Sequence, residues 1–204
     1  MKTIVIYAHP RTPGHCHETL KQVKSELSKR RKQYEVLDLY AMKYDPVMHE
    51  DEHYTTPEHR HVSALNKKIQ DKISKAKNLI FIYPIWWNSE PAILKGFMEK
   101  VFTARFAFYY AKLWYASWLL GGIPMPLLRR KKAAVMTTSS SKKWVFWLFE
   151  GRFRGLKVMT HDTLGFFGIK AKNFHLGGCT SLTEERKKKV QKNVLKAVKW
   201  LYRN

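Results

Sequence analysis

The sequence predicts a three-layer α/β/α domain, in which helices cover both faces of a five-stranded parallel sheet with the strand order 2-1-3-4-5. Two observations predict this class. Short, continuous apolar runs of the kind that buried parallel strands require recur along the chain, and amphipathic segments of helical period separate them. No internal repeat or linker interrupts this alternation. We therefore expect a single domain over residues 1–204.

The first half of the chain alternates regularly. Strands are expected at residues 3–8, 34–39 and 78–83, and helices at residues 17–30 and 59–75. The third strand should end at Pro84, because proline has no N–H to donate to a ladder. A helix is expected at 91–102, since Pro91 suits an early helical position where the amide has no intrahelical partner.

The second half begins with an aromatic insertion at about 104–130. A fourth strand is expected at 132–138, a mixed helical segment up to 167, a fifth strand at 172–176 and a final helix at 183–201. The final helix carries the clearest signals. The sequence Ser181-Leu182-Thr183-Glu184 has the form of a capping box, and one apolar stripe follows it, formed by Val190, Val194, Leu195, Val198 and Leu201.

The composition limits the class of protein. With 204 residues, 45% of them hydrophobic, the chain can bury a substantial core. Lys2 leads directly into a strand-like run, so we expect no secretory signal, and no apolar stretch approaches the ~18 residues of a membrane span. The two cysteines, Cys16 and Cys179, form no C-x-x-C pair, which favours a reducing compartment. These features indicate a cytoplasmic protein.

The loop at residues 9–17 is a candidate phosphate site. In sheets of this order, ligands bind beyond the carboxyl ends of the strands where the winding direction reverses, which is between the first and third strands. This loop leads into a helix amino terminus, whose free N–H groups attract phosphate. His9 and Arg11 can add donors, and His15, Cys16 and His17 lie at the helix start. The alternatives are an ordinary strand-to-helix turn and, for Cys16, a small residue without a redox role.

A second candidate segment follows the third strand. Trp86 and Trp87 are expected between a strand end and a helix start, where they suggest a site for a flat, redox-active ring. The alternative is a buried aromatic cluster, which is the commoner environment of such side chains. Polar residues at the end of the fourth strand would complete the pocket, namely Thr137, Thr138, Ser139 and Ser140.

The sequences of three segments resemble those of the flavodoxin-like NAD(P)H:quinone oxidoreductases, a family that includes the ancillary quinone reductases of potassium-efflux systems. The first is the apolar strand that ends in His9-Pro10, and the third is Ala133-Ala134-Val135-Met136-Thr137-Thr138. The second is Tyr83-Pro84-Ile85-Trp86-Trp87, with Pro91-Ala92-Ile93-Leu94-Lys95-Gly96 and Phe106-Ala107-Phe108 after it. The segments occur in the family's order and span almost the whole chain.

The resemblance implies an enzyme with tightly bound, non-covalent FMN or FAD, which passes hydride from NAD(P)H by a ping-pong mechanism to quinones, azo dyes or nitroaromatics. It places the flavin ring against the backbone of Pro84, Ile85, Trp86, Trp87 and Asn88. Phe108 and Tyr110 match positions on the substrate side of the ring, often across a homodimer interface. Relatives have Gly-Gly and then a Tyr and a His after the fourth strand. Here Ser139-Ser140-Ser141-Lys142 follows, so those roles do not transfer.

Two alternative functions accompany this reading. One is a redox-sensing regulatory subunit of a membrane transporter. The other is a one-electron flavodoxin carrier, which the strong positive charge disfavours because such carriers are usually acidic.

The net charge of +22 exceeds what an anionic cofactor requires. The basic runs at 29–32, 129–132 and 187–189 suggest a polyanionic partner. An acidic membrane surface is one candidate, because Trp114, Tyr115, Trp118, Leu119 and Leu120 form an aromatic and apolar stretch. Nucleic acid is less favoured, since no binding motif accompanies the charge. A solvated surface is an equally good explanation, and a lid or dimer contact is the preferred interpretation of residues 113–128.

Four histidines, His49, His53, His59 and His61, lie among acidic residues and invite a metal hypothesis. Their spacing matches no established zinc framework. We therefore expect no metal site there, but a polar loop close to the cofactor.

Overall fold

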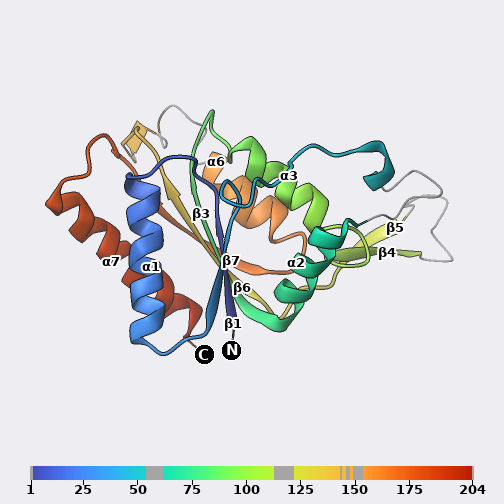
Figure 1. Cartoon of the computed structure of the whole chain (residues 1–204). Helices are drawn as coiled ribbons and strands as arrows, with labels where there is room; N and C mark the ends of the chain where they lie inside the picture. The colour runs from blue at the N-terminus through green and yellow to red at the C-terminus, as the bar shows by residue number, and fades with distance from the viewer. Residues whose placement is uncertain are drawn as a thin grey trace.

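The computed structural model describes residues 2–53, 62–112, 122–142, 144, 145, 148 and 154–203. Five parallel strands form one sheet with the order β2-β1-β3-β6-β7 (Figure 1). The strands are β1 (Lys2–Tyr7), β2 (Tyr34–Asp38), β3 (Ala76–Pro84), β6 (Lys132–Thr138) and β7 (Lys170–Leu176). Numbered along the chain, this order is 2-1-3-4-5, so the predicted topology is confirmed.

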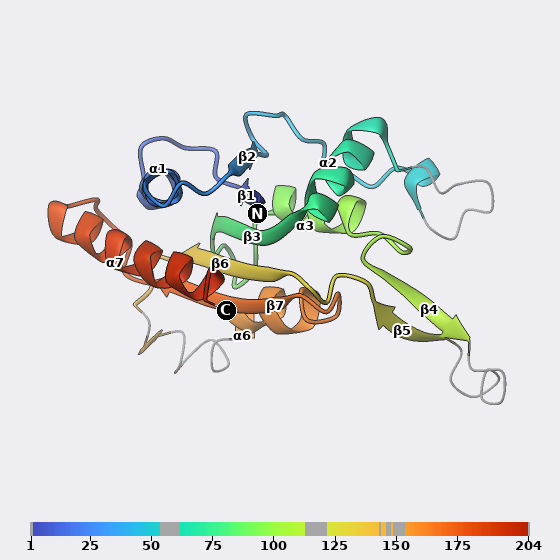
Figure 2. The same cartoon turned by 90° about the horizontal axis from the view of Figure 1, so that it is seen from below.

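Helices cover both faces of the sheet (Figures 1 and 2). One face packs against α1 (His15–Lys29) and α7 (Glu184–Leu201). The other packs against α2 (Ala64–Lys75), α3 (Ala92–Val101) and the π-helical segment η2 (Val158–Thr163), which α6 (Arg154–Lys157) precedes. Side chains of a strand alternate between the faces, so Ile4 and Val5 of β1 enter different cores. This explains why the central strands are apolar at consecutive positions.

The register brings the carboxyl ends of the strands to one edge of the sheet. Tyr7 of β1 pairs with Ile82 of β3, and Tyr83 pairs with Thr137 of β6. Thr137 in turn pairs with His175 of β7. Loops that leave these strands are therefore neighbours, although they are far apart in the sequence.

The boundaries of several elements differ from the prediction. α1 begins at His15, two residues before the predicted start, because the chain becomes helical directly after Gly14. α2 begins at Ala64, where the Ser63 hydroxyl accepts a hydrogen bond from the Asn66 amide and caps the helix. Residues 62 and 63, which were predicted to be helical, precede it, and residues 59–61 lie outside the described residues. β3 and β7 each start two residues earlier than predicted.

The predicted insertion contains a hairpin that the sequence did not indicate. β4 (Phe108–Lys112) and β5 (Gly122–Pro126) form an antiparallel pair that extends away from the main sheet (Figure 2). Phe108 packs at its base, with its ring centroid 5.0 Å from that of Phe166. The aromatic stretch predicted at 114–120 lies outside the described residues.

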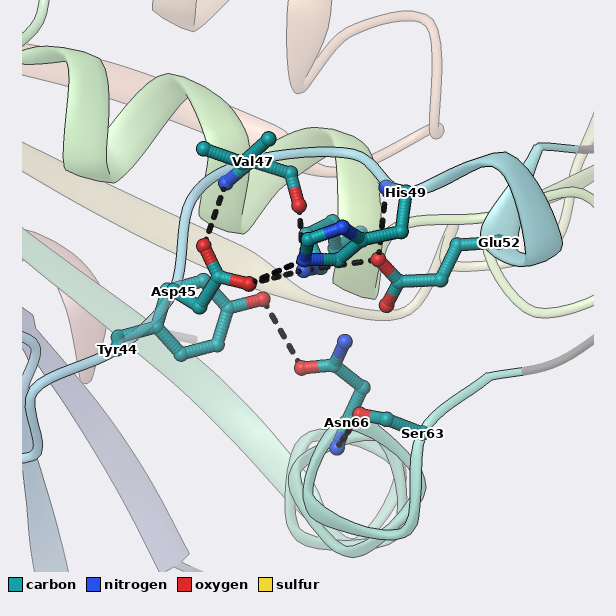
Figure 3. Close-up of polar contacts among 8 residues, drawn as sticks. Tyr44, Asp45, Val47, His49, Glu52, Ser63 and Asn66 are labelled. Carbon is teal, nitrogen blue, oxygen red and sulfur yellow. Dashed lines mark hydrogen bonds and ion pairs between the residues drawn. The ribbon is translucent and has the colours of Figure 1, made fainter.

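The segment after β2 is anchored to α3 by a buried lysine. Figure 3 shows Asp45, Val47, His49 and Glu52 of this segment turned toward one another. The side chain of Lys100 is only 5% exposed, and its Nζ lies 2.8 Å from Oε2 of Glu52 in the short 3₁₀-helix η1 (Glu50–Glu52). The same Nζ donates to the Val47 carbonyl at 2.7 Å. Gly96 permits this approach, because a Cβ there would lie 2.1 Å from the Pro46 carbonyl oxygen.

His49 belongs to the same cluster. Its Nε2 lies 2.7 Å from Oδ2 of Asp45, and this hydrogen bond is the largest cause that lowers the pKa of Asp45 to about 2. In the part of the chain that the structure describes, no group of three or more His, Cys, Asp or Glu is arranged to hold a metal ion. His59 and His61 lie outside that part. Over the same ranges, no helix combines the length and the apolar character needed to cross a membrane.

Candidate functional site

A cleft of about 700 Å³ opens at the carboxyl ends of β1, β3, β6 and β7. Four segments from distant parts of the sequence line it: the loops after β1, after β3 and after β6, and the loop before α7. Ten of the predicted site residues lie in its wall, namely His9, Arg11, His15, Cys16, Pro84, Ile85, Trp86, Thr138, Ser139 and Ser140. The sequence analysis predicted that the loops after the first, third and fourth strands form one pocket, and the structure brings these loops together.

The amino terminus of α1 forms one end of the cleft. The first intrahelical hydrogen bond runs from the Glu18 amide to the Gly14 carbonyl at 2.8 Å, and no side chain caps this end. The amides of His15, Cys16 and His17 therefore have no intrahelical partner. Together with the helix dipole they attract an anion such as phosphate.

His15 adds a ring nitrogen to this end, which becomes a donor when the ring is protonated. Its Nε2 is buried and has no hydrogen-bond partner among the described residues. Burial lowers the pKa of His15 below its usual range and the charge of Arg186 lowers it further, against a hydrogen bond to the Ser181 backbone that raises it. An orphaned buried imidazole nitrogen beside an uncapped helix start fits the phosphate of a bound ligand.

His9 and Cys16 have local roles that the sequence left open. The Arg11 amide donates to Nδ1 of His9 at 3.0 Å, and burial lowers the pKa of His9. The Sγ of Cys16 lies 3.0 Å from Oγ1 of Thr138, and burial raises the pKa of this thiol to about 12. Burial is the largest influence on this thiol, and the contact with Thr138 favours the interpretation of Cys16 as a small packing residue.

The aromatic segment forms a tight turn after β3. The Trp86 amide donates to the Ser89 carbonyl at 3.0 Å, and the Ser89 amide donates to the Trp86 carbonyl at 2.9 Å. The two central residues, Trp87 and Asn88, have positive φ angles of 49° and 60°, a costly conformation for residues other than glycine. Trp87 is fully exposed, so the buried-cluster alternative is wrong for this side chain.

This turn leaves a defined set of donors. The Ile85 amide is already bonded to the Thr138 carbonyl at 2.8 Å. The amides of Trp87 and Asn88 have no partner within the described residues. Trp87 and Asn88 border a second hollow of about 670 Å³. It shares four lining residues with the cleft, namely Ile85, Trp86, Ser139 and Ser140. A planar ligand that spans both hollows would meet these free amides at one edge.

Behind the wall of the cleft, His175 connects Thr137 and Ser139. Ser139 Oγ donates to the Ser141 carbonyl at 2.9 Å and lies 3.2 Å from Nε2 of His175. A hydroxyl has one proton, and a carbonyl can only accept. With the Ser139 proton on the Ser141 carbonyl, the proton in the second contact comes from the histidine, so this geometry favours the Nε2–H form.

The other side of the ring is also hydrogen-bonded. Nδ1 of His175 lies 3.0 Å from Oγ1 of Thr137, which in turn lies 3.4 Å from the amide nitrogen of Asn173. The network directs the Ser139 proton away from the histidine, toward the Ser141 carbonyl or a ligand. Ser139 is thereby prepared to act as a donor. The sequence placed Thr137 in the pocket, but the side chain is buried one layer behind it.

One wall of the cleft was missed by the sequence analysis. Cys179, Thr180, Ser181 and Leu182, which follow β7, line it. The Cys179 amide donates to the Ser139 carbonyl at 2.8 Å, which holds this loop against the end of β6. The signal that was available is Gly177-Gly178 directly after a strand, at the edge where the other site loops lie.

Six of the sixteen predicted residues do not line the cleft: Thr137 lies behind it, Trp87 and Asn88 border the second hollow, and the other three are His17, Phe108 and Tyr110. The side chain of His17 does not line it, although its amide belongs to the helix start. Phe108 and Tyr110 are on the β4–β5 hairpin and pack edge-to-face at 5.5 Å, away from the cleft.

A family model described as a flavodoxin-like fold matches residues 1–201. Among curated proteins, the ribosyldihydronicotinamide dehydrogenase (quinone) of Mus musculus is 31% identical over 205 residues, which cover 91% of this chain and 86% of the relative. The solved structure of Smu.1420 from Streptococcus mutans is 31% identical, with a TM-score of 0.80 over 97% of this chain and 98% of that one. An FMN-dependent NADH-azoreductase from Bacillus anthracis in complex with FMN has the same fold, with 18% identity, a TM-score of 0.73 and full coverage of both chains.

Proposed function

The chain belongs to the family of proteins with a flavodoxin-like fold, and from this premise we propose that it is a flavin-dependent NAD(P)H:quinone oxidoreductase. The observation that supports this most strongly is the composition of the cleft. Among the described residues, a helix start without a side-chain cap and an imidazole nitrogen without a partner lie at one end, and an aromatic turn with two unbonded amides lies at the other. A flavin has a phosphate and a polar ring edge at matching positions.

At the phosphate end, the amides of α1 and Nε2 of His15 would hold the anion, and Arg11 would add charge from the loop. Phosphate would favour the protonated form of His15, because it supplies the negative charge that this site otherwise lacks. FMN, which the azoreductase neighbour binds, has one phosphate, and this end of the cleft would be sufficient to hold it. FAD would need a further subsite for adenine.

At the ring end, a bound flavin supplies the ability to accept and release hydride. The chain would position it: Trp86 would pack beside the ring, and the amides of Trp87 and Asn88 would donate to its polar edge. Ser139 would donate from the opposite wall in exchange for its present bond to the Ser141 carbonyl, with His175 still bonded to its oxygen. Donors fixed in advance stabilise the negative charge that the ring gains on reduction.

NAD(P)H and the quinone would use the same open side of the cleft in turn, which gives a ping-pong cycle. We further propose that the enzyme acts as a homodimer. Phe108 and Tyr110 lie outside the cleft of their own chain, so a second copy is needed to bring them to the substrate side of a flavin. Azo or nitroaromatic compounds would enter by the same route. A cytoplasmic location is likewise a prediction.

Colour and reduction test the proposal. The purified protein is expected to be yellow, and the released chromophore should migrate as FMN or FAD in chromatography. Mixing with NADH or NADPH in a stopped-flow instrument should bleach the flavin, and a quinone should restore its colour. A colourless protein that does not bind FMN, FAD or riboflavin in a titration would rule the function out.

A further inference from the structure

Two basic runs that are far apart in the sequence meet at one edge of the molecule. The run 29–32 follows the end of α1, and the run 129–132 leads into β6. In a parallel sheet the strands all begin at one edge, and the helices that precede them end there. This edge is opposite to the cleft, which lies at the carboxyl ends of the strands.

The carboxyl-terminal residues connect the two runs. Lys32 Nζ lies 4.9 Å from the centroid of the Tyr202 ring, and the Tyr202 hydroxyl is 2.6 Å from Oγ1 of Thr3 at the start of β1. Lys132 Nζ donates to the Arg203 carbonyl at 2.5 Å. Figure 1 shows both chain ends at this edge. The basic edge therefore comprises Lys29, Arg30, Arg31, Lys32, Lys75, Lys77, Arg129, Arg130, Lys132, Lys170 and Arg203.

A groove of about 780 Å³ runs along part of this edge, at the base of the β4–β5 hairpin. Five exposed cationic residues line it, namely Lys75, Lys77, Arg105, Arg129 and Arg130, and its described lining contains no Asp or Glu. Lys131 has a different role. Its Nζ donates to the carbonyls of Ile73, Ser74 and Ala76 at 2.7, 3.0 and 2.6 Å, so its N–H groups close the end of α2 and are not available to bind a headgroup.

Two acids close to the basic edge are already paired. Glu26 forms an ion pair with Arg30 at 2.5 Å, and Glu35 bridges Lys2 and Lys72 at 2.5 and 2.6 Å. The cations of the groove form none of the described ion pairs. A surplus of positive charge is therefore concentrated here, and the proposed enzymatic cycle at the other edge makes no use of it.

We propose that this basic edge docks on an anionic lipid surface and that the groove receives phospholipid headgroups. The cations project from the ends of α1 and α2 and from the starts of β3, β6 and β7, so they are spread over the width of the sheet. Cations spread in this way match a planar array of headgroups. A rod-shaped DNA duplex would contact only one row of them. Leu127, 45% exposed in the groove, adds apolar contact at the boundary with the bilayer. The cleft would face away from the lipid and stay open to solvent.

Co-sedimentation of the full chain with vesicles tests the proposal, with or without flavin, so its outcome is independent of the enzymatic function. The protein should bind vesicles of equimolar phosphatidylcholine and phosphatidylglycerol, and not vesicles of phosphatidylcholine alone. Raised salt should release it. Arg129→Glu/Arg130→Glu should weaken binding at least about tenfold, and Lys75→Glu/Lys77→Glu should do the same.

The matched control is Lys188→Glu/Lys192→Glu. These lysines are exposed on α7 outside the basic edge, and the change in net charge is the same. The control should bind nearly as well as the wild type, and thermal unfolding should show that all three variants fold. If the control loses as much vesicle binding as the two edge variants, the basic edge is not the lipid-binding surface. Absence of binding to anionic vesicles, or displacement from them by an equal charge of duplex DNA, would overturn the choice of lipid.

Discussion

Nε2 of His175 lies 3.2 Å from Oγ of Ser139, so a histidine on the edge strand β7 controls a hydroxyl in the wall of the cleft. Ser139 was a predicted site residue, whereas His175 was not, because the two are far apart in the sequence.

Replacement of His175 by leucine should remove the contact that orients the Ser139 hydroxyl. The interaction of Ser139 with the reduced flavin should then weaken more than its interaction with the oxidised flavin. We expect the relative affinity for reduced flavin to fall about tenfold, which corresponds to a midpoint potential lower by about 30 mV. His175→Gln keeps an N–H donor, so its midpoint potential should be close to that of the wild type. Spectroelectrochemical titration measures the midpoint potentials of both variants.

The hydrogen-bond assignment has a test that needs no cofactor. Long-range ¹H–¹⁵N spectra of the flavin-free protein should show neutral His175 with its proton on Nε2. A proton on Nδ1 would contradict the assignment even if flavin binding is confirmed.

Gly155→Ala should displace the aromatic turn. A Cβ at this position would lie 2.2 Å from the Asn88 carbonyl oxygen, and a backbone atom cannot move aside without shifting the turn. We expect at least about tenfold weaker FMN binding and a loss of roughly 1–3 kcal/mol of stability, as for other overpacked sites. Gly14→Ala is the control for stability, because its Cβ would meet nothing within 4 Å. If fluorescence titration shows unchanged FMN affinity in Gly155→Ala, the position of the turn is not important for binding.

Lys100→Met should destabilise the fold by about 3 kcal/mol, since it leaves the nearly buried carboxylate of Glu52 without its partner. Lys95→Met is the matched control on the same helix. Lys95 and Glu99 form an exposed ion pair, so its loss should cost less than about 1 kcal/mol. Urea denaturation compares the two. The double variant Lys100→Met/Glu52→Gln should recover much of the stability, and failure to recover it would show that the ion pair is not the cause.

His15 should make the stability of the flavin-free protein depend on pH. Its folded-state pKa is lowered below the usual 6.5, so the unfolded chain binds the proton more readily. The free energy of unfolding should therefore decrease as the pH falls from about 7.5 through 6.5 toward the folded-state pKa. His15→Gln should reduce this slope, and His9, whose pKa is also lowered, should account for part of the remainder.

Phosphate should reverse the preference of His15 for its neutral form. The affinity for FMN relative to riboflavin, which lacks the phosphate, should rise as the pH falls from about 7.5 to 6. In His15→Gln the ratio should vary less with pH. Fluorescence titrations at several pH values measure it, and a ratio with the same pH dependence in both proteins would exclude contact between His15 and the phosphate.

The strands, their order and the position of the cleft could be predicted because each depends on local signals. Four apolar residues before Pro84 indicate a buried strand, and the capping sequence before Glu184 marks the last helix. Parallel pairing of such strands leaves few topologies, and each places the loops after β1 and β3 side by side. The hairpin of β4 and β5 was missed because aromatic residues suit a strand, a lid and an interface equally well.

The sequence by itself determined the type of fold and the loops that carry the candidate site, because hydrophobic period and turn residues act over a few positions along the chain. Only the tertiary structure decided which polar groups meet: His175 with Ser139, Lys100 with Glu52, and the loop after β7 with the end of β6. It also decided that two separate basic runs share one edge. These contacts depend on strand register and helix packing between residues far apart in the chain, and a pattern of neighbouring residues contains no information about such distances.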